Sequence, residues 1–406
     1  MALNPCFRPA LLATLALLLA GCGRPPPPVA APANPASPAW VAALEREVGS
    51  IDATLPGDFG AYVRRLGPPD EAGELDLGDG RAWYLSSTIK VPVAIAVLEA
   101  ADAGDLSLDE ELELAAGDFV DGAGDMLQHA PGERFSIAAL LEKSLRDSDS
   151  TATDMLIRRI GEERLNARVA AWTGEGFGRI TPIRQVRYDA YGALHPKVAD
   201  LDSMQMLALR QAKAGEPRLQ ALADALGVPR AELGDATLEQ VFEDYYARGL
   251  NSATLPAYGR LLARLAGGEL LSPRSTDLLL GHMRAINTGS RRIQAGLPPD
   301  ADFAQKTGTQ LQRACNVGLL DPGLGRDGAT VVVACAERFG ELEQAEQAFQ
   351  ALGRALADTL TVRDWHARKR IRGGCMPRRD RRYWRLPAQP RRGRCRPPHF
   401  LRYGYA

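Results

Sequence analysis

Apolar positions recur with a helical period through most of this chain. Residues 40–58 carry apolar side chains on one face at helical spacing, which predicts an amphipathic first helix. Further helical patterns occupy residues 91–171, 203–267, 274–286 and 342–360. Residues 180–202 are polar and show no clear period, so we expect an irregular segment there.

Short apolar runs typical of strands lie near both ends of the chain. They occupy residues 60–66, 81–85, 303–306, 315–320 and 330–336. The first two flank a polar turn that contains Asp76, Gly78 and Gly80. Strands at both ends around a helical middle predict a helical lobe set against an α/β lobe. With 406 residues, 45% of them hydrophobic, the chain can bury a large core, either as one two-lobed domain or as two small domains.

The first residues resemble a targeting segment. Arg8 precedes about eleven apolar residues at 10–20, fewer than the roughly 20 needed to span a bilayer. Because small residues lead to Cys22, we predict that residues 1–22 are a cleaved secretory signal. The end of this segment resembles a bacterial lipobox, which implies a lipid on Cys22; the alternative is an ordinary signal peptide with an incidental cysteine.

A segment rich in proline and alanine follows at residues 23–39 and is typical of an extended, semi-rigid linker. The folded part of the chain would begin at residue 40 and end at about residue 362. We therefore expect a lipid-anchored protein on the periplasmic side of a bacterial envelope membrane.

Charge divides the chain into two unlike parts. Residues 362–406 contain 15 Lys and Arg against 2 Asp and Glu, while the remainder contains 34 against 48. An arginine- and proline-rich run without an apolar period cannot build a core, so we expect residues 363–406 to be disordered or irregular. This tail either binds anionic lipids or nucleic acid electrostatically or is a non-native extension, and we assign it no function.

Two cysteines flank a turn between predicted strands. If Leu320 pairs with Thr330 across the turn at 321–325, Cys315 lies opposite Cys335. A cross-strand disulfide is then one interpretation, and two buried free thiols are the interpretation that we favour.

The first candidate for chemistry is a serine followed three residues later by a lysine. Ser87 and Lys90 stand at the start of the apolar run 91–103. Residues three apart on a helix share a face, with their Cβ atoms about 5–6 Å apart, so the amine can reach the hydroxyl. A serine hydroxyl needs such a neighbouring base to become a nucleophile.

Two further motifs follow in the order S-x-x-K, S-D-N, K-T-G. They are Ser148, Asp149 and Ser150, and then Lys306, Thr307, Gly308 and Thr309. Over residues 40–360 the chain thus resembles the penicillin-recognising serine hydrolases, and among them the class A β-lactamase-like branch. The resemblance implies a β-lactamase/transpeptidase-like α/β fold, in which helices from the N- and C-terminal parts flank an antiparallel sheet beside a helical lobe. The segment at residues 212–251 is longer than we expect for this family, and we interpret it as a helical insertion.

The resemblance also implies a role for each motif residue. Ser87 would be acylated and neutral Lys90 would take its proton, with burial and the nearby Lys306 lowering the pKa of Lys90. Ser148 would pass a proton to the leaving nitrogen. The oxyanion would bind the backbone N–H groups of Ser87 and Thr309. The other residues implied to contact the substrate are Ser150, Lys306, Thr307, Gly308 and Arg313. Of these, Lys306, Thr307 and Arg313 would bind the substrate carboxylate.

Two departures from the family pattern concern the acyl side chain and deacylation. Ser150 stands where the family has asparagine, which implies weaker contact with the acyl side chain of the substrate. Arg187 stands where class A enzymes carry the glutamate that activates water. Residues 162–166 match the glutamate motif but lie inside an expected helix at 153–172, so we interpret them as a chance match. Asp189 is the nearest carboxylate, and we expect intact acylation with impaired deacylation.

The sequence therefore predicts a monomeric, cofactor-independent serine hydrolase that opens a β-lactam amide or a related small amide or ester bearing a carboxylate. One alternative is a D-alanyl-D-alanine carboxypeptidase or related cell-wall hydrolase, and another is a penicillin-binding lipoprotein that has lost turnover. The five histidines have no ligand spacing, so we expect no metal site. We expect small-molecule substrates and no nucleic-acid partner.

Overall fold

Five antiparallel strands form the central sheet of the computed structural model, which describes residues 37–360. In chain order they are β1 (Asp58–Arg65), β2 (Gly73–Leu77), β7 (Phe303–Gln310), β8 (Arg313–Leu320) and β9 (Thr330–Glu337). Their order across the sheet is β2-β1-β9-β8-β7, so the first and last strands of the chain meet in the middle. This order makes β7 an edge strand.

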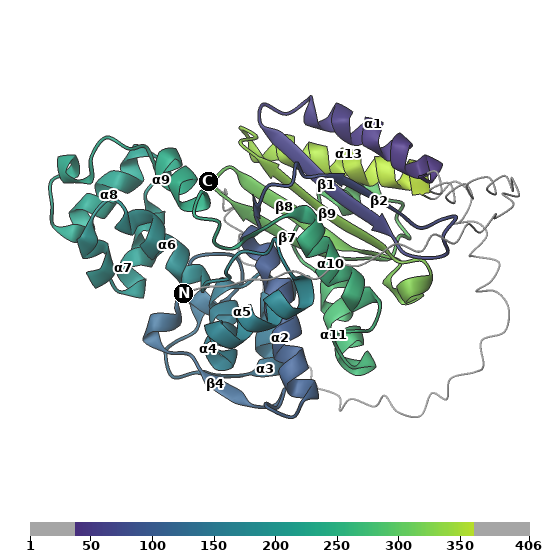
Figure 1. Ribbon diagram of the computed structural model, residues 1–406. Coiled ribbons are helices and arrows are strands. Elements are labelled where there is room, and N and C mark those ends of the chain that lie inside the picture. Colours follow the sequence, from purple (N-terminus) through teal and green to yellow (C-terminus); the bar gives the residue numbers. More distant parts are fainter. Residues whose placement is uncertain (1–36, 361–406) are drawn as a thin grey trace, which may run out of the picture. The chain divides into compact units, whose positions relative to one another are not determined.

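Alternating side chains of the sheet enter two separate cores. On β9, Val331 and Val333 face one core, whereas Val332 and Ala334 face the other. Helices α1 (Ala39–Asp52) and α13 (Leu342–Leu360) cover the second face together (Figure 1). Helix α10 (Leu255–Ala266) covers the first face, and the short helix α12 (Ile293–Gly296) packs against α13. The predicted α/β lobe is therefore confirmed.

The helical lobe surrounds a helix that is apolar on nearly all sides. Helix α2 (Lys90–Asp102) is buried along most of its length, because other helices pack around it. These helices are α3 (Ile137–Arg146), α4 (Ser150–Ile160), α5 (Glu162–Thr173) and α11 (Pro273–Arg284). The strands β4 (Glu111–Glu113) and β5 (Arg134–Ser136) form a two-stranded sheet, and β5 leads directly into α3.

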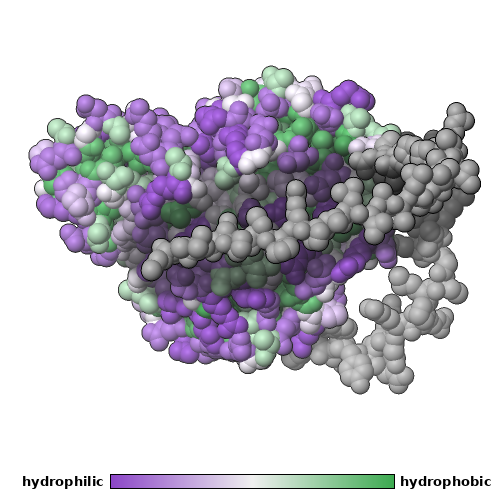
Figure 2. All heavy atoms as spheres, in the orientation of Figure 1, coloured by the Kyte–Doolittle hydropathy of each residue, from purple (hydrophilic) through white to green (hydrophobic). Residues whose placement is uncertain are grey.

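Four helices between residues 183 and 246 share a core of their own. They are α6 (Ile183–Gly192), α7 (Ser203–Ala208), α8 (Glu216–Leu226) and α9 (Leu238–Tyr246). We call them the accessory helices; their buried residues form one cluster with Tyr84, whose ring contacts Tyr245 and Tyr246. The visible surface of this part is largely hydrophilic (Figure 2). The helical character predicted for 212–251 is confirmed, with α8, the short turn Arg230–Leu233 and α9 in this segment.

Several predicted elements differ from the structure. The first helix ends at Asp52, because the Asp52 carboxylate accepts the N–H of Phe59 and the chain turns into β1 (2.7 Å). The polar turn is present at Gly78 and Gly80, but Asp76 lies before it in the strand β2, which pairs with β1. Of residues 81–85, only β3 (Trp83–Tyr84) is a strand, and it pairs with β6 (Ser252–Ala253).

The prediction of an irregular segment at 180–202 is wrong, since α6 occupies its middle. The N-terminus of α6 is capped by Asp154 of α4, whose carboxylate accepts the N–H groups of Ile183 (2.7 Å) and Arg184 (2.8 Å). A cap supplied from a distant helix leaves no local pattern in the sequence. The helix expected at 153–172 is also interrupted, at Gly161, whose φ of 83° ends α4 before α5 begins.

Cys315 and Cys335 form a disulfide between β8 and β9. The predicted register is confirmed, with Leu320 opposite Thr330 and Cys315 opposite Cys335, whereas the favoured interpretation of two free thiols is wrong. Both cysteines are buried in the sheet core.

Replacing both cysteines by alanine is expected to lower the free energy of unfolding by about 3 kcal/mol. The bond closes a loop of 20 residues in the unfolded chain, and losing that constraint favours unfolding. Urea denaturation of the Cys315→Ala/Cys335→Ala variant against the wild type measures the change. A peptide map without reductant that recovers the two cysteines on separate peptides would contradict the bond.

The predictions for the signal peptide, Cys22, most of the linker at 23–39 and the tail at 363–406 lie outside the described residues. Within residues 37–360, no helix combines the length and the apolar character needed to cross a membrane.

Candidate active site

Ser87 lies in a single 3₁₀ turn, Ser86–Ile89, that leads directly into α2. The amine of Lys90, the first residue of α2, lies 3.1 Å from the hydroxyl of Ser87. Lys90 is completely buried, and within the described part of the chain its hydrogen bonds go to serine oxygens and not to a carboxylate. Ser86 has a positive φ of 49°, a costly conformation for a residue with a side chain. The turn thus holds a nucleophile and an amine in contact.

Ser148 brings a second hydroxyl between two amines. It occupies the bend between α3 and α4 with a φ of 59°. Lys90 donates to its carbonyl oxygen (2.5 Å) and lies 3.3 Å from its hydroxyl, while Lys306 donates to the same hydroxyl (2.8 Å). Asp149 fixes the bend, because its carboxylate accepts the N–H groups of Ala152 (2.9 Å) and Met126 (3.0 Å).

The edge strand β7 forms the opposite wall. A Cβ atom added to Gly308 would lie 2.7 Å from both the Leu85 carbonyl oxygen and the Ser87 nitrogen. Only glycine therefore lets this strand lie against the turn that carries Ser87. Next to it, the hydroxyls of Thr307 and Thr288 are 2.6 Å apart. The structure thus brings the three motifs together around one point.

Both lysine amines have a lowered pKa. Burial lowers the pKa of Lys90 to about 8, against the opposing attraction of Asp149 and Asp154. The pKa of Lys306 lies well below its usual range, first because it is buried and then because Lys90 and Arg292 are close. An uncharged amine can accept a proton, so the arrangement suits proton transfer from Ser87.

A pocket opens in front of these groups. Its lining includes the motif residues Ser87, Ser148, Ser150, Thr307, Gly308 and Thr309. Ser150 lies 3.3 Å from the Lys90 amine through its hydroxyl, so this short side chain contacts the amine. The accessory helices contribute Arg187 and Arg218 to the same pocket, with Arg210 from the turn that follows α7.

Arg292 is a site residue that the sequence analysis missed. Its guanidinium donates to the carbonyl oxygens of Gly308 (2.9 Å) and Cys315 (2.8 Å) and to the Thr309 hydroxyl (2.5 Å). It is buried and ties β7 to β8 directly behind the pocket. The neighbouring Arg291 is exposed and pairs with Glu346, and no sequence pattern distinguishes the two arginines.

Arg313, expected to bind the substrate, lies elsewhere. Its guanidinium pairs with Glu243 (2.6 Å) and Glu337 (3.4 Å) and stacks on Tyr246 at 4.4 Å, and it does not line the pocket. Helix α9 provides Glu243 and Tyr246, which the three motifs could not anticipate. Arg313 therefore joins β8 to α9.

The structure places Asp189, the carboxylate considered as a water base, outside the pocket, whereas Asp121 lies in the lining. Asp189 accepts a hydrogen bond from Gln185 (2.9 Å), pairs with Arg248 (3.2 Å) and does not line the pocket. Arg187 does line it and pairs with Asp121 (2.9 Å); burial disfavours its charge, but Asp121 outweighs this and raises the pKa of Arg187.

The glutamates of the chance match at 162–166 also lie outside the pocket. Glu162 and Glu163 begin α5 and both pair with Arg179, at 2.7 Å and 2.6 Å. In the described part of the chain, no three histidine, cysteine or acidic side chains are grouped so that they could hold a metal ion.

The chain matches a known protein family and two curated proteins. The family model described as "Beta-lactamase enzyme family" matches residues 43–360. Beta-lactamase VEB-1 of Pseudomonas aeruginosa is 24% identical over 59% of this chain and 64% of its own length, so the chain spans less than two thirds of that relative. The beta-lactamase regulatory protein BlaB of Streptomyces cacaoi is 26% identical over 77% of this chain and 94% of its own.

Solved structures confirm the fold. The structure of PBP-A superimposes with a TM-score of 0.57 at 21% identity, covering 78% of this chain and 94% of that one. A likeness at this level of identity concerns the fold alone. The predicted β-lactamase/transpeptidase-like fold is therefore confirmed.

Proposed function

The chain belongs to the beta-lactamase enzyme family, and from this we propose that it is a serine hydrolase of the class A type that works through an acyl-enzyme on Ser87. One observation carries the proposal: a buried amine with a lowered pKa lies 3.1 Å from the Ser87 hydroxyl at the pocket. A serine and a base in hydrogen-bond contact are the minimum for nucleophilic catalysis.

In the proposed acylation, Lys90 takes the proton of Ser87 as the Ser87 oxygen attacks the substrate carbonyl. The resulting oxyanion would bind the backbone N–H groups of Ser87 and Thr309, since β7 lies against the turn that carries Ser87. As the C–N bond breaks, Ser148 would give its proton to the leaving nitrogen. The contacts of Ser148 with Lys90 and Lys306 support this step, because either amine can then restore the proton.

The substrate would carry a carboxylate next to the leaving nitrogen. Thr307, which lines the pocket, is the proposed contact, with the buried Lys306 amine bonded to its carbonyl oxygen and Arg292 supplying positive charge behind β7. Arg313 is occupied by Glu243 and Glu337, which removes it from this proposal. A β-lactam, or another small amide or ester with this carboxylate, fits these requirements.

A second candidate function rests on the missing water base. Arg187 replaces the expected glutamate, and Asp121 is occupied by that arginine. A protein that acylates but releases the acyl group slowly would act as a penicillin-binding protein or a D-alanyl-D-alanine peptidase, or as a sensor. BlaB matches this chain over 94% of its own length and is named a regulatory protein, and this name favours the second candidate function.

The proposed setting is periplasmic. The lipobox-like sequence before Cys22 supports a lipid anchor on an envelope membrane, and the linker at 23–39 would hold the enzyme away from the lipid. We propose a monomer, since the four motif residues all come from one chain.

Incubating the protein with benzylpenicillin is expected to give a covalent adduct on Ser87. Intact-mass spectrometry over time should show one added penicilloyl mass in the wild type and none in Ser87→Ala. Ser86→Ala is the matched control, because Ser86 also lines the pocket but its hydroxyl is buried and has no hydrogen-bond partner among residues 37–360. An adduct that decays indicates a β-lactamase, and one that persists indicates the second candidate. An adduct of equal yield in Ser87→Ala would refute both.

A further inference from the structure

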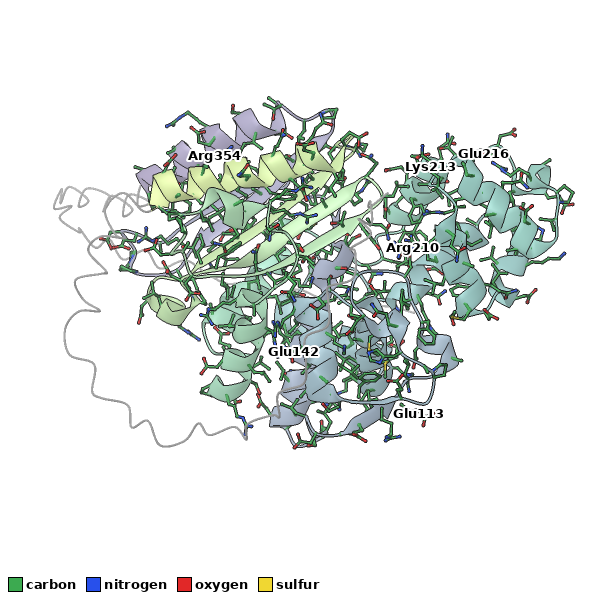
Figure 3. All side chains as sticks on the ribbon, turned by 180° about the vertical axis from the view of Figure 1, so that it is seen from behind. Glu113, Glu142, Arg210, Lys213, Glu216 and Arg354 are labelled. Atoms are coloured by element: carbon green, nitrogen blue, oxygen red, sulfur yellow. A yellow bond between two sulfur atoms is a disulfide. The ribbon has the colours of Figure 1, made fainter. Side chains whose placement is uncertain are left out.

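Three arginines gather on one wall of the pocket. They are Arg187 of α6, Arg210 of the turn Leu209–Gln211 and Arg218 of α8. All three surround one carboxylate, that of Asp121: Arg187 pairs with it at 2.9 Å and Arg210 at 3.4 Å. Burial would raise the pKa of Asp121, but the three arginines outweigh it and lower that pKa. Figure 3 shows Arg210 where the accessory helices meet the rest of the fold.

The charges in this arginine cluster do not balance. Asp121 supplies one negative charge for three guanidinium groups. The other acids of the pocket lining, Glu239 and Glu341, are exposed and form no ion pair with the cluster in the described part of the chain. The cluster therefore keeps an excess of positive charge at the pocket wall.

Arg218 shows the imbalance most directly. The residue is only 9% exposed, and its Nη2 atom donates to the carbonyl oxygen of Ala212 (2.8 Å). Its buried Nε atom has no hydrogen-bond partner among residues 37–360. No carboxylate among residues 37–360 forms an ion pair with Arg218. Buried guanidinium groups are normally paired, so an arginine without an ion pair at a pocket wall points to an anionic ligand.

The position of the cluster defines which part of a substrate it would meet. Asp121 is followed by Gly122, where an added Cβ would lie 2.5 Å from the Ser150 hydroxyl. The cluster thus adjoins Ser150, whereas the proposed site for the substrate carboxylate is at Thr307 on β7. A substrate that lies across Ser87 with its carboxylate at β7 would extend its acyl group toward the arginines.

We propose that the arginine cluster binds a second carboxylate, on the acyl side chain of the substrate. The preferred substrate would then carry one negative charge on each side of the bond that Ser87 opens. Guanidinium groups suit this task because they pair with carboxylates through two parallel hydrogen bonds. The inference rests on the proposed function and adds the substrate class.

Two penicillins that differ only in this carboxylate provide the test. α-Carboxybenzylpenicillin and benzylpenicillin would be compared by the second-order rate constant for adduct formation on Ser87, measured by intact mass. The wild type is expected to favour the carboxylated compound by about tenfold or more, the effect of one charge-assisted hydrogen bond. In Arg210→Gln the ratio should fall severalfold, and in Arg210→Gln/Arg218→Gln it should approach one.

Arg230→Gln is the matched control. Arg230 lies on the same insertion and pairs with Glu216 at 2.8 Å, but it does not line the pocket, so its loss should leave the ratio at the wild-type value. Arg210 is exposed enough that its variant is expected to fold, and it decides the test if the double variant does not. The wild-type preference should also shrink as salt is added.

The outcomes separate this inference from the function on which it rests. Equal rates for the two penicillins in the wild type would overturn the second-carboxylate site and leave the acyl-enzyme proposal standing. Retention of the full preference in Arg210→Gln would overturn that site as well. No adduct with either compound would overturn both proposals together.

Discussion

Replacing Lys90 by methionine lowers the rate of Ser87 acylation by roughly a thousandfold, within the range that a general base contributes. Methionine keeps much of the length of the side chain but cannot accept a proton. The fold should persist, because an apolar side chain is at least as well suited to this fully buried position as an amine. Adduct formation with benzylpenicillin, followed by intact mass, measures the loss, and thermal unfolding checks the fold.

The wild-type acylation rate should rise as the pH is raised through about 8 and then level off. The lowered pKa of Lys90 means that the amine is mostly charged below pH 8 and mostly neutral above it, and only the neutral amine can act as the base. Lys197→Met, at an exposed lysine far from the motif serines in sequence, is the control and should keep both rate and profile. A rate independent of pH between about 6 and 10 would exclude Lys90 as the base.

Patterns that act over short distances were readable from the sequence. Ser87 and Lys90 are three residues apart, a spacing that places them about one helical turn apart on the same face, and the structure gives contact between their side chains. The register of β8 and β9 followed from one turn, because antiparallel pairing fixes every later pair once Leu320 meets Thr330. Helix α13 begins at its predicted residue and continues to the last described one, because its amphipathic pattern is uninterrupted.

Features that depend on distant partners were not readable. Helix α6 begins where it does because Asp154 of another helix caps it, and that helix places Arg187 in the pocket. Arg313 was assigned to the substrate because its sequence position suggested it, but two carboxylates hold it instead. Arg292 carries no motif, and only the folded sheet shows that its donors meet the carbonyl groups of β7 and β8.

The close contact between β7 and the turn that carries Ser87 is the second feature whose disruption should have a large effect. In Gly308→Ala the new methyl group would lie 2.7 Å from the Leu85 carbonyl oxygen, 2.7 Å from the Ser87 nitrogen and 2.9 Å from the Ser86 Cβ atom. Two of these neighbours are backbone atoms of the strand end and turn that hold Ser87, so they cannot move aside as a flexible side chain would. Either β7 or the turn must shift.

Gly308→Ala is therefore expected to slow acylation by about a hundredfold, the typical cost of misplacing catalytic groups by about 1 Å. It should also lower the free energy of unfolding by about 1–3 kcal/mol through overpacking. Gly281→Ala is the control: this glycine lies in α11 with no atom within 4 Å of the added Cβ, so acylation should not change and the helix should gain up to about 1 kcal/mol. Adduct kinetics and urea denaturation of both variants measure these effects. Because the oxyanion donors proposed here lie on either side of Gly308, acylation at the wild-type rate in Gly308→Ala would mean that this contact does not form the oxyanion site.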